Sequence, residues 1–308
     1  MDLKQQEYLV AIADCENITK AAEQLYLTPS ALNQQLLKLE RELGLQLFIR
    51  SHHRVTPTPA GEIYINGCRQ MLAVRQQTYT LLQDLKDQKI GSYEIGLTFE
   101  HGRDMFAKVY PAFHAEYPGI SIHCRQLMTQ DMLDMLRDGR LDIAFILTGY
   151  PQLYQGVDYL DFSQENLLLG LPITHPLVDP DEPTYPPAKA IDLRQLEHDD
   201  FSTALSNSTM RSELIDPLFQ RAGFRPNIVT ESSYNSFLEQ TASMGLCNTI
   251  IPQSQVRDHT NVAWYYLPHA PRFHFGAAYP KGYQLSRAMQ RFIELARSYA
   301  QEYLQFGS

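Results

Sequence analysis

Apolar residues recur along the first part of the chain at the spacing of helix faces. Residues 3–14 carry leucine, isoleucine and alanine on one side of a helix, and the pattern stops at the tripeptide CEN. A shorter pattern follows in TKAAEQL, where Asn17 or Thr19 can cap the first turn. Two short helices are therefore expected at the start of the chain.

A third helix begins at a strong start signal. Thr28 is a favourable N-cap, and Pro29 suits the first helical position because its missing N–H is not needed there. From about 29 to 43 the pattern places leucines on one face and polar residues on the other, and Gly44 ends it. The leucines expected to be buried are Leu32, Leu36, Leu39 and Leu43.

The next segment, LQLFIRSHHRVTPTPAG, predicts two short strands around a basic turn, which is the shape of a wing. Neighbouring side chains of a strand point to opposite faces, so His52 and His53 are not expected to grasp one metal together. Helices and wing together predict a winged helix-turn-helix that is complete by about residue 60.

A long amphipathic helix is expected from Pro59 to about residue 87. Seven positions recur at alternating spacings of four and three, as in a coiled-coil seam, and such a narrow stripe favours a partner helix. We therefore interpret 61–88 as a linker helix for dimerisation. The alternative is a helix that packs on its own domain. The seam positions are Tyr64, Cys68, Met71, Arg75, Thr78, Leu82 and Leu85.

Beyond residue 88, strands and helices alternate, so the fold class is α/β with a head made mostly of helices. The order strand, helix, strand predicts right-handed crossovers and parallel pairing. Two chain crossings, near 161–164 and 264–268, divide this half into two α/β lobes. We assign 89–162 and 267–308 to lobe I and 163–266 to lobe II. The first strands expected are YEIGLTF, SIHCRQL and LDIAFIL.

Composition limits the partners. The net charge is −9, from 26 Lys and Arg against 35 Asp and Glu, which argues against a protein that coats nucleic acid by bulk electrostatics. Any DNA contact must therefore be local. The four cysteines show no CxxC pair, which favours reduced thiols over a zinc knuckle or a disulfide framework. They are Cys15, Cys68, Cys124 and Cys247.

The start of the chain leads directly into an amphipathic helix, without the basic and then apolar pattern of a signal peptide. No apolar run approaches membrane-spanning length. We therefore expect a soluble, cytoplasmic protein that makes no membrane contact.

Residues 21–61, which contain AAEQLYLTPSALNQQLLKLERELGLQLFIR and VTPTPAG, closely resemble the head of LysR-type transcription regulators. Later motifs agree, namely YPGI, LRDGRLDIAF, His175-Pro176-Leu177 and MGLCNTIIP. The resemblance implies a sequence-specific regulator whose winged helix-turn-helix, residues 1–60, binds a double-stranded operator as a homodimer or homotetramer. It also implies that 89–308 is an effector-binding domain of the periplasmic-binding-protein architecture, with a small molecule between its lobes.

This chain departs from the usual family pattern at four places. Glu16-Asn17 stand where the family usually has Gly-Ser, Pro29-Ser30 where it has Gln-Pro, and Cys247 replaces a usual glycine. Asn33-Gln34 replace a common Ser-Arg, which removes a cation that would face DNA. The family's base and phosphate contacts therefore carry over only in part.

Side-chain amides can pair with the N6 and N7 edges of adenine in the major groove, so Asn33 and Gln34 are the predicted base-reading residues, assisted by Ser30. The alternative is that these amides only solvate an exposed face.

Phosphate contacts are expected nearby. Thr28 and the helix N-terminus suit phosphate because backbone N–H groups there bind anions, and Lys38, Arg50 and Arg54 would add charge. Arg50 has a second interpretation, as a structural arginine paired with Glu40 or Glu42.

The effector site is expected where the strands end, along the walls of the two lobes. Hydroxyls and helix N-termini commonly bind anions, so an anionic metabolite is the first expectation, with the acidic Glu100 as a reason for caution. For each hydroxyl the alternative is a turn-stabilising role. The predicted contacts are Thr98, Glu100, His101, Met128, Thr129, Thr148, Ser202 and Thr203.

An enzyme with an appended DNA-binding head is the rival interpretation. The sequence contains no GxSxG, HExxH or Walker A string, and its histidines show no metal-ligand spacing, so we predict neither catalysis nor a cofactor or metal. A transport-type binding protein is disfavoured because a signal peptide is not recognised.

Overall fold

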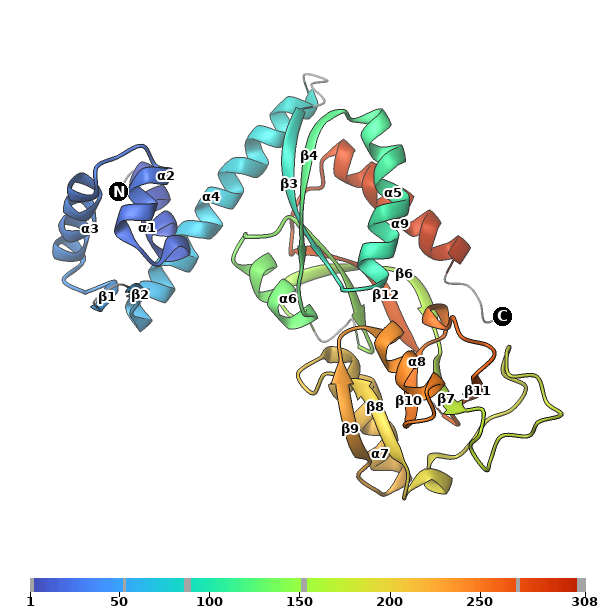
Figure 1. Ribbon diagram of the computed structural model, residues 1–308. Helices are drawn as coiled ribbons and strands as arrows, with labels where there is room; N and C mark the ends of the chain where they lie inside the picture. Colours follow the sequence, from blue (N-terminus) through green and yellow to red (C-terminus); the bar gives the residue numbers. More distant parts are fainter. Residues whose placement is uncertain (1–2, 52–53, 86–89, 151–153, 270–271, 304–308) are drawn as a thin grey trace. The chain divides into compact units, whose positions relative to one another are not determined.

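The computed structural model describes residues 3–51, 54–85, 90–150, 154–269 and 272–303, which form two compact units that divide near residue 88. Figure 1 shows both, with the first unit in blue. His52 and His53 lie outside the described residues. No helix within these ranges is long and apolar enough to cross a bilayer.

The first unit begins with the three predicted helices, α1 (Leu3–Cys15), α2 (Ile18–Gln24) and α3 (Pro29–Leu43). Asn17 caps α2 by accepting hydrogen bonds from the N–H groups of Thr19 and Lys20, and Thr28 caps α3 by accepting from Ala31 N–H. Gly44 ends α3 in the left-handed conformation, with φ of 67°. The predicted start and end signals are thus confirmed.

The leucines of α3 pack against α1 and α2 to form the core of the head. Leu32, Leu36 and Leu39 are buried, as predicted. Leu43 differs, because it lies in the last turn beside Gly44 and is 39% exposed.

Strands β1 (Phe48–Ser51) and β2 (Arg54–Pro57) pair antiparallel and form the wing. Helix α4 (Pro59–Leu85) follows, and Thr58 caps it by accepting from Gly61 N–H at 3.0 Å. The backbone of this first turn touches the preceding chain so closely that a Cβ on Gly61 would lie 1.9 Å from Leu47 O. Glycine is therefore required at this position.

Lobe I of the second unit is a five-stranded sheet with the order β4-β3-β5-β12-β6. β3 pairs parallel with β4 and β5, as expected for strand–helix–strand units, and β12 pairs antiparallel with β5 and β6. Its elements are β3 (Ile90–Leu97), α5 (His101–Glu116), β4 (Gly119–Gln126), α6 (Thr129–Arg137), β5 (Ile143–Thr148), β6 (Val157–Glu165), β12 (Phe273–Pro280) and α9 (Arg287–Tyr303).

Lobe II is a second five-stranded sheet, with the order β11-β7-β10-β8-β9. β8 pairs parallel with β9 and β10, and β7 pairs antiparallel with β10 and β11. Its elements are β7 (Leu167–Pro172), the 3-10 turn η2 (Leu193–Leu196), β8 (Asp200–Ala204), the π-helix η3 (Met210–Ile215), α7 (Asp216–Ala222), β9 (Asn227–Ser232), α8 (Asn235–Ser243), β10 (Asn248–Pro252), the 3-10 turn η4 (Gln253–Gln255) and β11 (Val262–Tyr266).

Each lobe has its own apolar core. In lobe I, α5 and α9 cover one face of the sheet around Phe113, Phe145 and Phe292, and α6 covers the other. In lobe II, Phe201 and Phe219 pack edge to face beneath β8. The chain passes from lobe I to lobe II between β6 and β7, at residue 166, slightly later than expected, because β6 continues to Glu165.

Candidate DNA-binding and effector sites

The face of α3 opposite its leucines is exposed and mostly polar. Ser30, Gln34 and Lys38 recur on it every four residues, and Arg41 continues the same stripe. Lys38 Nζ lies 4.0 Å from Glu42 Oε1, and both side chains are more than half exposed, so this pair holds Lys38 only weakly. Arg41 was not among the predicted contacts, although its helical spacing from Gln34 was a usable signal.

Asn33 has different surroundings from Gln34. It lies at the edge of the stripe, is half-buried, and its Oδ1 is covered without a hydrogen-bond donor among the described residues. Gln34 is exposed. Of the two predicted base-reading amides, only Gln34 is exposed to solvent.

The N-terminus of α3 is open for an anion. Thr28 is exposed, and its Oγ1 accepts from Ala31 N–H at 3.2 Å. The remaining N–H groups of the first turn carry the positive end of the helix dipole, which suits a phosphate.

The two arginines of the wing differ in their partners. Glu40 accepts hydrogen bonds from the backbone N–H groups of Leu47 and Phe48, at 2.8 and 3.2 Å. No ion pair joins Arg50 to a carboxylate in the described part of the chain, so the alternative pairing with Glu40 or Glu42 is not observed. Arg54 instead pairs with Glu16, with Nη2 and Oε2 2.6 Å apart.

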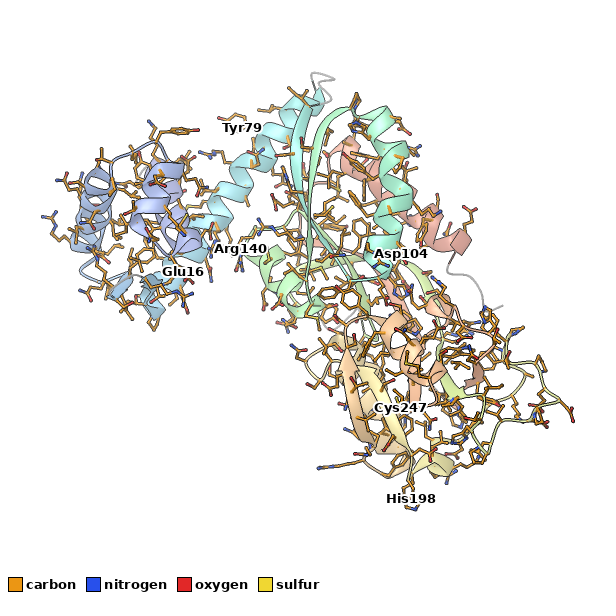
Figure 2. All side chains as sticks on the ribbon, in the orientation of Figure 1. Glu16, Tyr79, Asp104, Arg140, His198 and Cys247 are labelled. Atoms are coloured by element: carbon orange, nitrogen blue, oxygen red, sulfur yellow. The ribbon has the colours of Figure 1, made fainter. Side chains whose placement is uncertain are left out.

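Glu16 reaches the wing from the turn after α1, where Figure 2 labels it. Its φ of 47° is unusual for a residue with a side chain, and its carbonyl accepts from Val55 N–H at 2.8 Å. This turn therefore holds the second wing strand.

A cavity of about 90 Å³ lies at the carboxyl ends of the parallel strands of the second unit, with walls from both lobes. Lobe I contributes the segments after β3 and β4, and lobe II the segments after β8 and β9. Five of the eight predicted contacts line it, namely Thr98, Glu100, His101, Met128 and Thr129.

The other three predicted contacts lie outside this lining. Thr148 is fully buried at the end of β5 and donates to Glu213 Oε2 at 3.1 Å. Ser202 and Thr203 are buried within β8, and Thr241 Oγ1 of α8 donates to Ser202 Oγ at 2.8 Å. β8 was not predicted from the sequence, and these two hydroxyls were expected at a strand end.

Among the cavity residues, Thr98 and Glu100 already have partners. Thr98 Oγ1 accepts from Gly102 N–H at 2.9 Å, which is the turn-stabilising alternative. Glu100, only 4% exposed, accepts from Asn235 N–H at 2.6 Å, from Ser236 N–H at 3.3 Å and from Ser236 Oγ at 2.9 Å. A lobe I carboxylate thus caps helix α8 of lobe II.

His101 joins the lobes in a buried cluster. Its Nε2 lies 2.9 Å from Glu165 Oε1 and 3.0 Å from Ser254 Oγ, and Ser254 N–H donates to Glu165 Oε2 at 2.9 Å. Both partners share one ring nitrogen, whereas a catalytic triad uses the two nitrogens for different partners. The described residues also contain no group of His, Cys, Asp and Glu arranged to hold a metal ion.

Comparison with known families adds to this geometry. Residues 3–62 match the family described as "Bacterial regulatory helix-turn-helix protein, lysR family", and residues 86–301 match "LysR substrate binding domain". The chain belongs to the LysR family. It is therefore a DNA-binding transcription regulator whose substrate-binding domain places it under effector control.

LysR-type relatives cover most of the chain. The "HTH-type transcriptional regulator AlsR" of Bacillus subtilis is 27% identical over 82% of this chain and 81% of its own length. The "Hca operon transcriptional activator HcaR" of Escherichia coli is 29% identical over 82% of each chain.

Two solved structures support the LysR fold. A full-length OxyR variant from Pseudomonas aeruginosa has a TM-score of 0.75 at 23% identity, over 96% of this chain and 98% of that one. Full-length CbnR complexed with its target DNA has a TM-score of 0.59 at 17% identity, over 97% of this chain and 99% of that one.

The lobe II lining of the cavity was not predicted from the sequence. It consists of Leu205, Ser208, Thr209 and Met210 in the loop LSNSTM after β8, together with Ser232, Ser233 and Asn235 at and beyond the end of β9. Ser208 Oγ donates to Leu205 O at 2.7 Å and accepts from Arg211 N–H at 3.1 Å, so it caps the π-helix. A run of small polar residues directly after a strand was the available signal.

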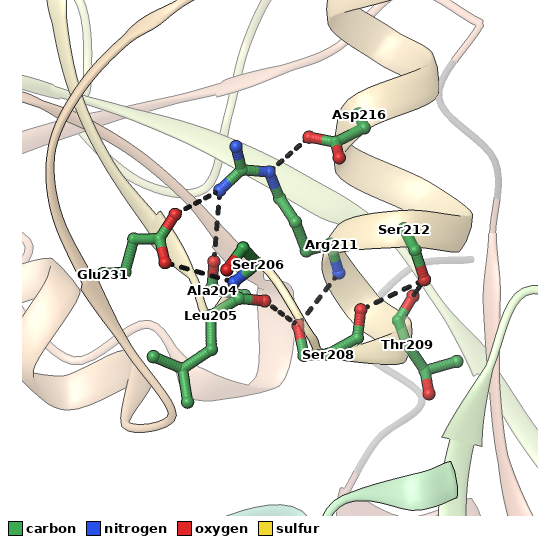
Figure 3. Close-up of polar contacts among 9 residues, drawn as sticks. All are labelled: Ala204, Leu205, Ser206, Ser208, Thr209, Arg211, Ser212, Asp216 and Glu231. Carbon is green, nitrogen blue, oxygen red and sulfur yellow. Dashed lines mark hydrogen bonds and ion pairs between the residues drawn. The ribbon is translucent and has the colours of Figure 1, made fainter.

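Arg211 braces this loop (Figure 3). Its guanidinium pairs with Asp216 and with Glu231 of β9, and also donates to Ala204 O at 3.3 Å. Glu231 in turn accepts from Ser206 N–H at 3.2 Å. Two carboxylates hold the guanidinium of Arg211, which fixes the loop, and Arg211 is not among the residues that line the cavity.

Proposed function

We propose that α3 reads an operator in the major groove, that the wing contacts neighbouring phosphates, and that a small molecule in the cavity between the lobes changes operator binding. The observation that carries the effector part of this proposal is the cavity itself. It is bounded by both lobes and lies where parallel strands end, so an occupant would touch each lobe.

For DNA, the exposed stripe supports Gln34 and Ser30 as base contacts, with Asn33 at its edge. Thr28, Lys38, Arg50 and Arg54 are proposed as phosphate contacts. Arg50 is free of a carboxylate partner among the described residues, whereas Arg54 must first leave Glu16. Arg50 should therefore contribute more to the salt dependence of binding.

For the effector, we propose contacts with Thr98, Glu100, His101, Met128 and Thr129, opposite Ser208 and Thr209. Thr148, Ser202 and Thr203 then support the walls rather than touch the ligand. Hydroxyl groups near the N-termini of helices often bind anions. Whether this cavity binds an anionic effector depends on the charged side chains around it.

Self-association as a dimer or tetramer is proposed to involve α4. The helix has two faces: Ile65 and Cys68 are buried against the head, while Ile63 and Val74 are 78% and 61% exposed on the other side. The exposed face supports pairing with a second copy.

The experiment is operator selection followed by titration. Immobilised full-length protein is incubated with sheared genomic DNA from its source, and the fragments it retains are sequenced. A selected fragment is then expected to bind at least about a thousandfold more tightly than a random duplex at physiological salt. The protein would not be a sequence-specific regulator if no fragment were bound in preference to the random duplex.

The effector half of the proposal uses the selected fragment. Metabolites that raise the melting temperature of the protein are added to the operator titration. At least one is expected to change operator affinity, and metabolites that stabilise the protein without any such change would contradict effector control from this cavity.

A further inference from the structure

The place in the cavity that best suits an anion is already filled by the protein. Helix α8 has nine residues, and its N-cap residue, Tyr234, makes no side-chain cap. Glu100 supplies the cap from lobe I through three hydrogen bonds, to Asn235 N–H, Ser236 N–H and Ser236 Oγ. The carboxylate therefore lies where a bound carboxylate or phosphate would lie.

The charges around Glu100 leave no room for a second anion. None of the described residues that line the cavity is a lysine or an arginine. Arg103, the nearest cation in sequence, interacts with the charge of Glu100, but it hydrogen-bonds Asp104 and is half exposed, so water screens this attraction. Arg211 is held by two carboxylates. His101, which also lines the cavity, bonds the carboxylate of Glu165.

A ligand anion in this cavity would lie beside a buried carboxylate, with no lysine or arginine among the described lining residues to balance it. Repulsion between like charges is strong where water is displaced. The same carboxylate attracts donors, because a carboxylate has about four acceptor positions and the described residues fill three of them.

We infer that Glu100 is an internal ligand of helix α8, and that the effector of this cavity is a small hydrogen-bond donor without negative charge. This rests on the proposed function of the cavity and replaces the expectation of an anionic metabolite. Glu100 sets specificity in two ways, because it occupies the helix terminus and repels acids. The hydroxyls of Thr129, Ser232 and Ser233 supply the remaining polar surface.

The first test is whether acetate can take the place of the missing carboxylate. Thermal unfolding of the full chain is followed with added sodium acetate, against sodium chloride of the same ionic strength. Glu100→Ala is expected to gain a saturable rise in melting temperature with acetate. The melting temperature of the wild type should follow the chloride control. Its apparent affinity for acetate should be at least about tenfold weaker than that of Glu100→Ala. Glu197→Ala, which removes an exposed charge elsewhere, should behave as the wild type.

Glu100→Gln provides the second variant if the alanine variant does not fold. It keeps an oxygen that accepts from α8 but removes the charge, so acetate affinity should again exceed that of the wild type. An equal acetate response in the wild type would overturn the inference. Folded variants that gain no acetate response would overturn it equally, because the place would then not be an anion site.

The ligand class is tested on the wild type with pairs of small carboxylic acids and their primary amides. The amides are expected to raise the melting temperature and the acids are not. An acid that stabilises the wild type more than its amide would contradict the inference. These measurements use neither operator nor regulated gene, so their failure is distinct from a failure of the proposed function.

Discussion

Two adjacent residues of α3, Asn33 and Gln34, both carry amide side chains but differ in how far the amide is exposed to solvent. Gln34 is exposed in the middle of a polar stripe, whereas Asn33 is half-buried with its Oδ1 covered. An amide that reads a base must present donor and acceptor together, and only Gln34 does so without rearrangement.

Gln34→Ala is therefore expected to weaken binding to the selected operator by about 1 to 3 kcal/mol and to leave binding to a random duplex nearly unchanged. Asn33→Ala should cost less specificity. Titration of both duplexes with both variants measures this. Equal losses on the two duplexes for Gln34→Ala would show that it does not read bases.

At the scale of elements, α4 has two faces with different surroundings. The helix contacts the head as far as Arg75, which pairs with Glu7 of α1 at 2.6 Å, and Gln6 Nε2 donates to Met71 Sδ at 3.4 Å. The predicted seam positions Tyr64, Cys68 and Arg75 thus face the head, as the alternative interpretation held. The exposed apolar residues, including Tyr79 (Figure 2), lie on other sides of the helix.

Val74→Glu is expected to reduce self-association without unfolding the head, because like charges would meet in the proposed contact. Gln76→Glu adds the same charge to an exposed position on another side of α4 and serves as the control. Sedimentation over a range of concentrations gives the result. If Val74→Glu associates as the wild type does, this face is not the principal interface.

The helix caps, the wing and the parallel pairing of the first strands could be predicted because each depends on local signals, such as Thr28 and Gly44 in the head. The environments of the two faces of α4 could not be predicted, because a heptad pattern does not indicate whether the chain's own head or a second copy of the helix covers the apolar face. The lobe II wall was not predicted because β8, the strand before it, is buried yet carries Ser202 and Thr203. Polar residues in a short segment are more typical of a loop than of a buried strand.

At the scale of the whole sensing unit, a second carboxylate joins the lobes. Glu213 of lobe II accepts from Gly149 N–H and Thr148 Oγ1, at 2.8 and 3.1 Å, and from the Tyr154 hydroxyl at 2.8 Å. Burial, followed by the neighbouring Glu213 carboxylate, raises the pKa of Tyr154, so this hydroxyl keeps its proton as a donor. Glu100 of lobe I therefore binds lobe II, and Glu213 of lobe II binds lobe I. We call these two sets of hydrogen bonds the clasp between the lobes.

Glu213→Gln is expected to destabilise the protein by about 1 to 3 kcal/mol, because an amide has one acceptor oxygen where the carboxylate has two. Small-angle scattering should show a larger radius of gyration if the clasp keeps the lobes closed. Tyr154→Phe removes one of the three bonds and should produce a smaller change. Unaltered stability in both variants would show that the clasp does not hold the lobes.

The position of β12 has a consequence for synthesis on the ribosome. It lies between β5 and β6 in the sheet of lobe I, yet it leaves the ribosome only after the whole of lobe II. β5 and β6 emerge early but cannot find their shared neighbour until more than a hundred residues have followed β6. The nascent chain can therefore complete the sheet of lobe II while that of lobe I is still open. The strand that closes lobe I also completes the pair of lobes, so a truncated product would lack the sensor even when its DNA-binding head was intact.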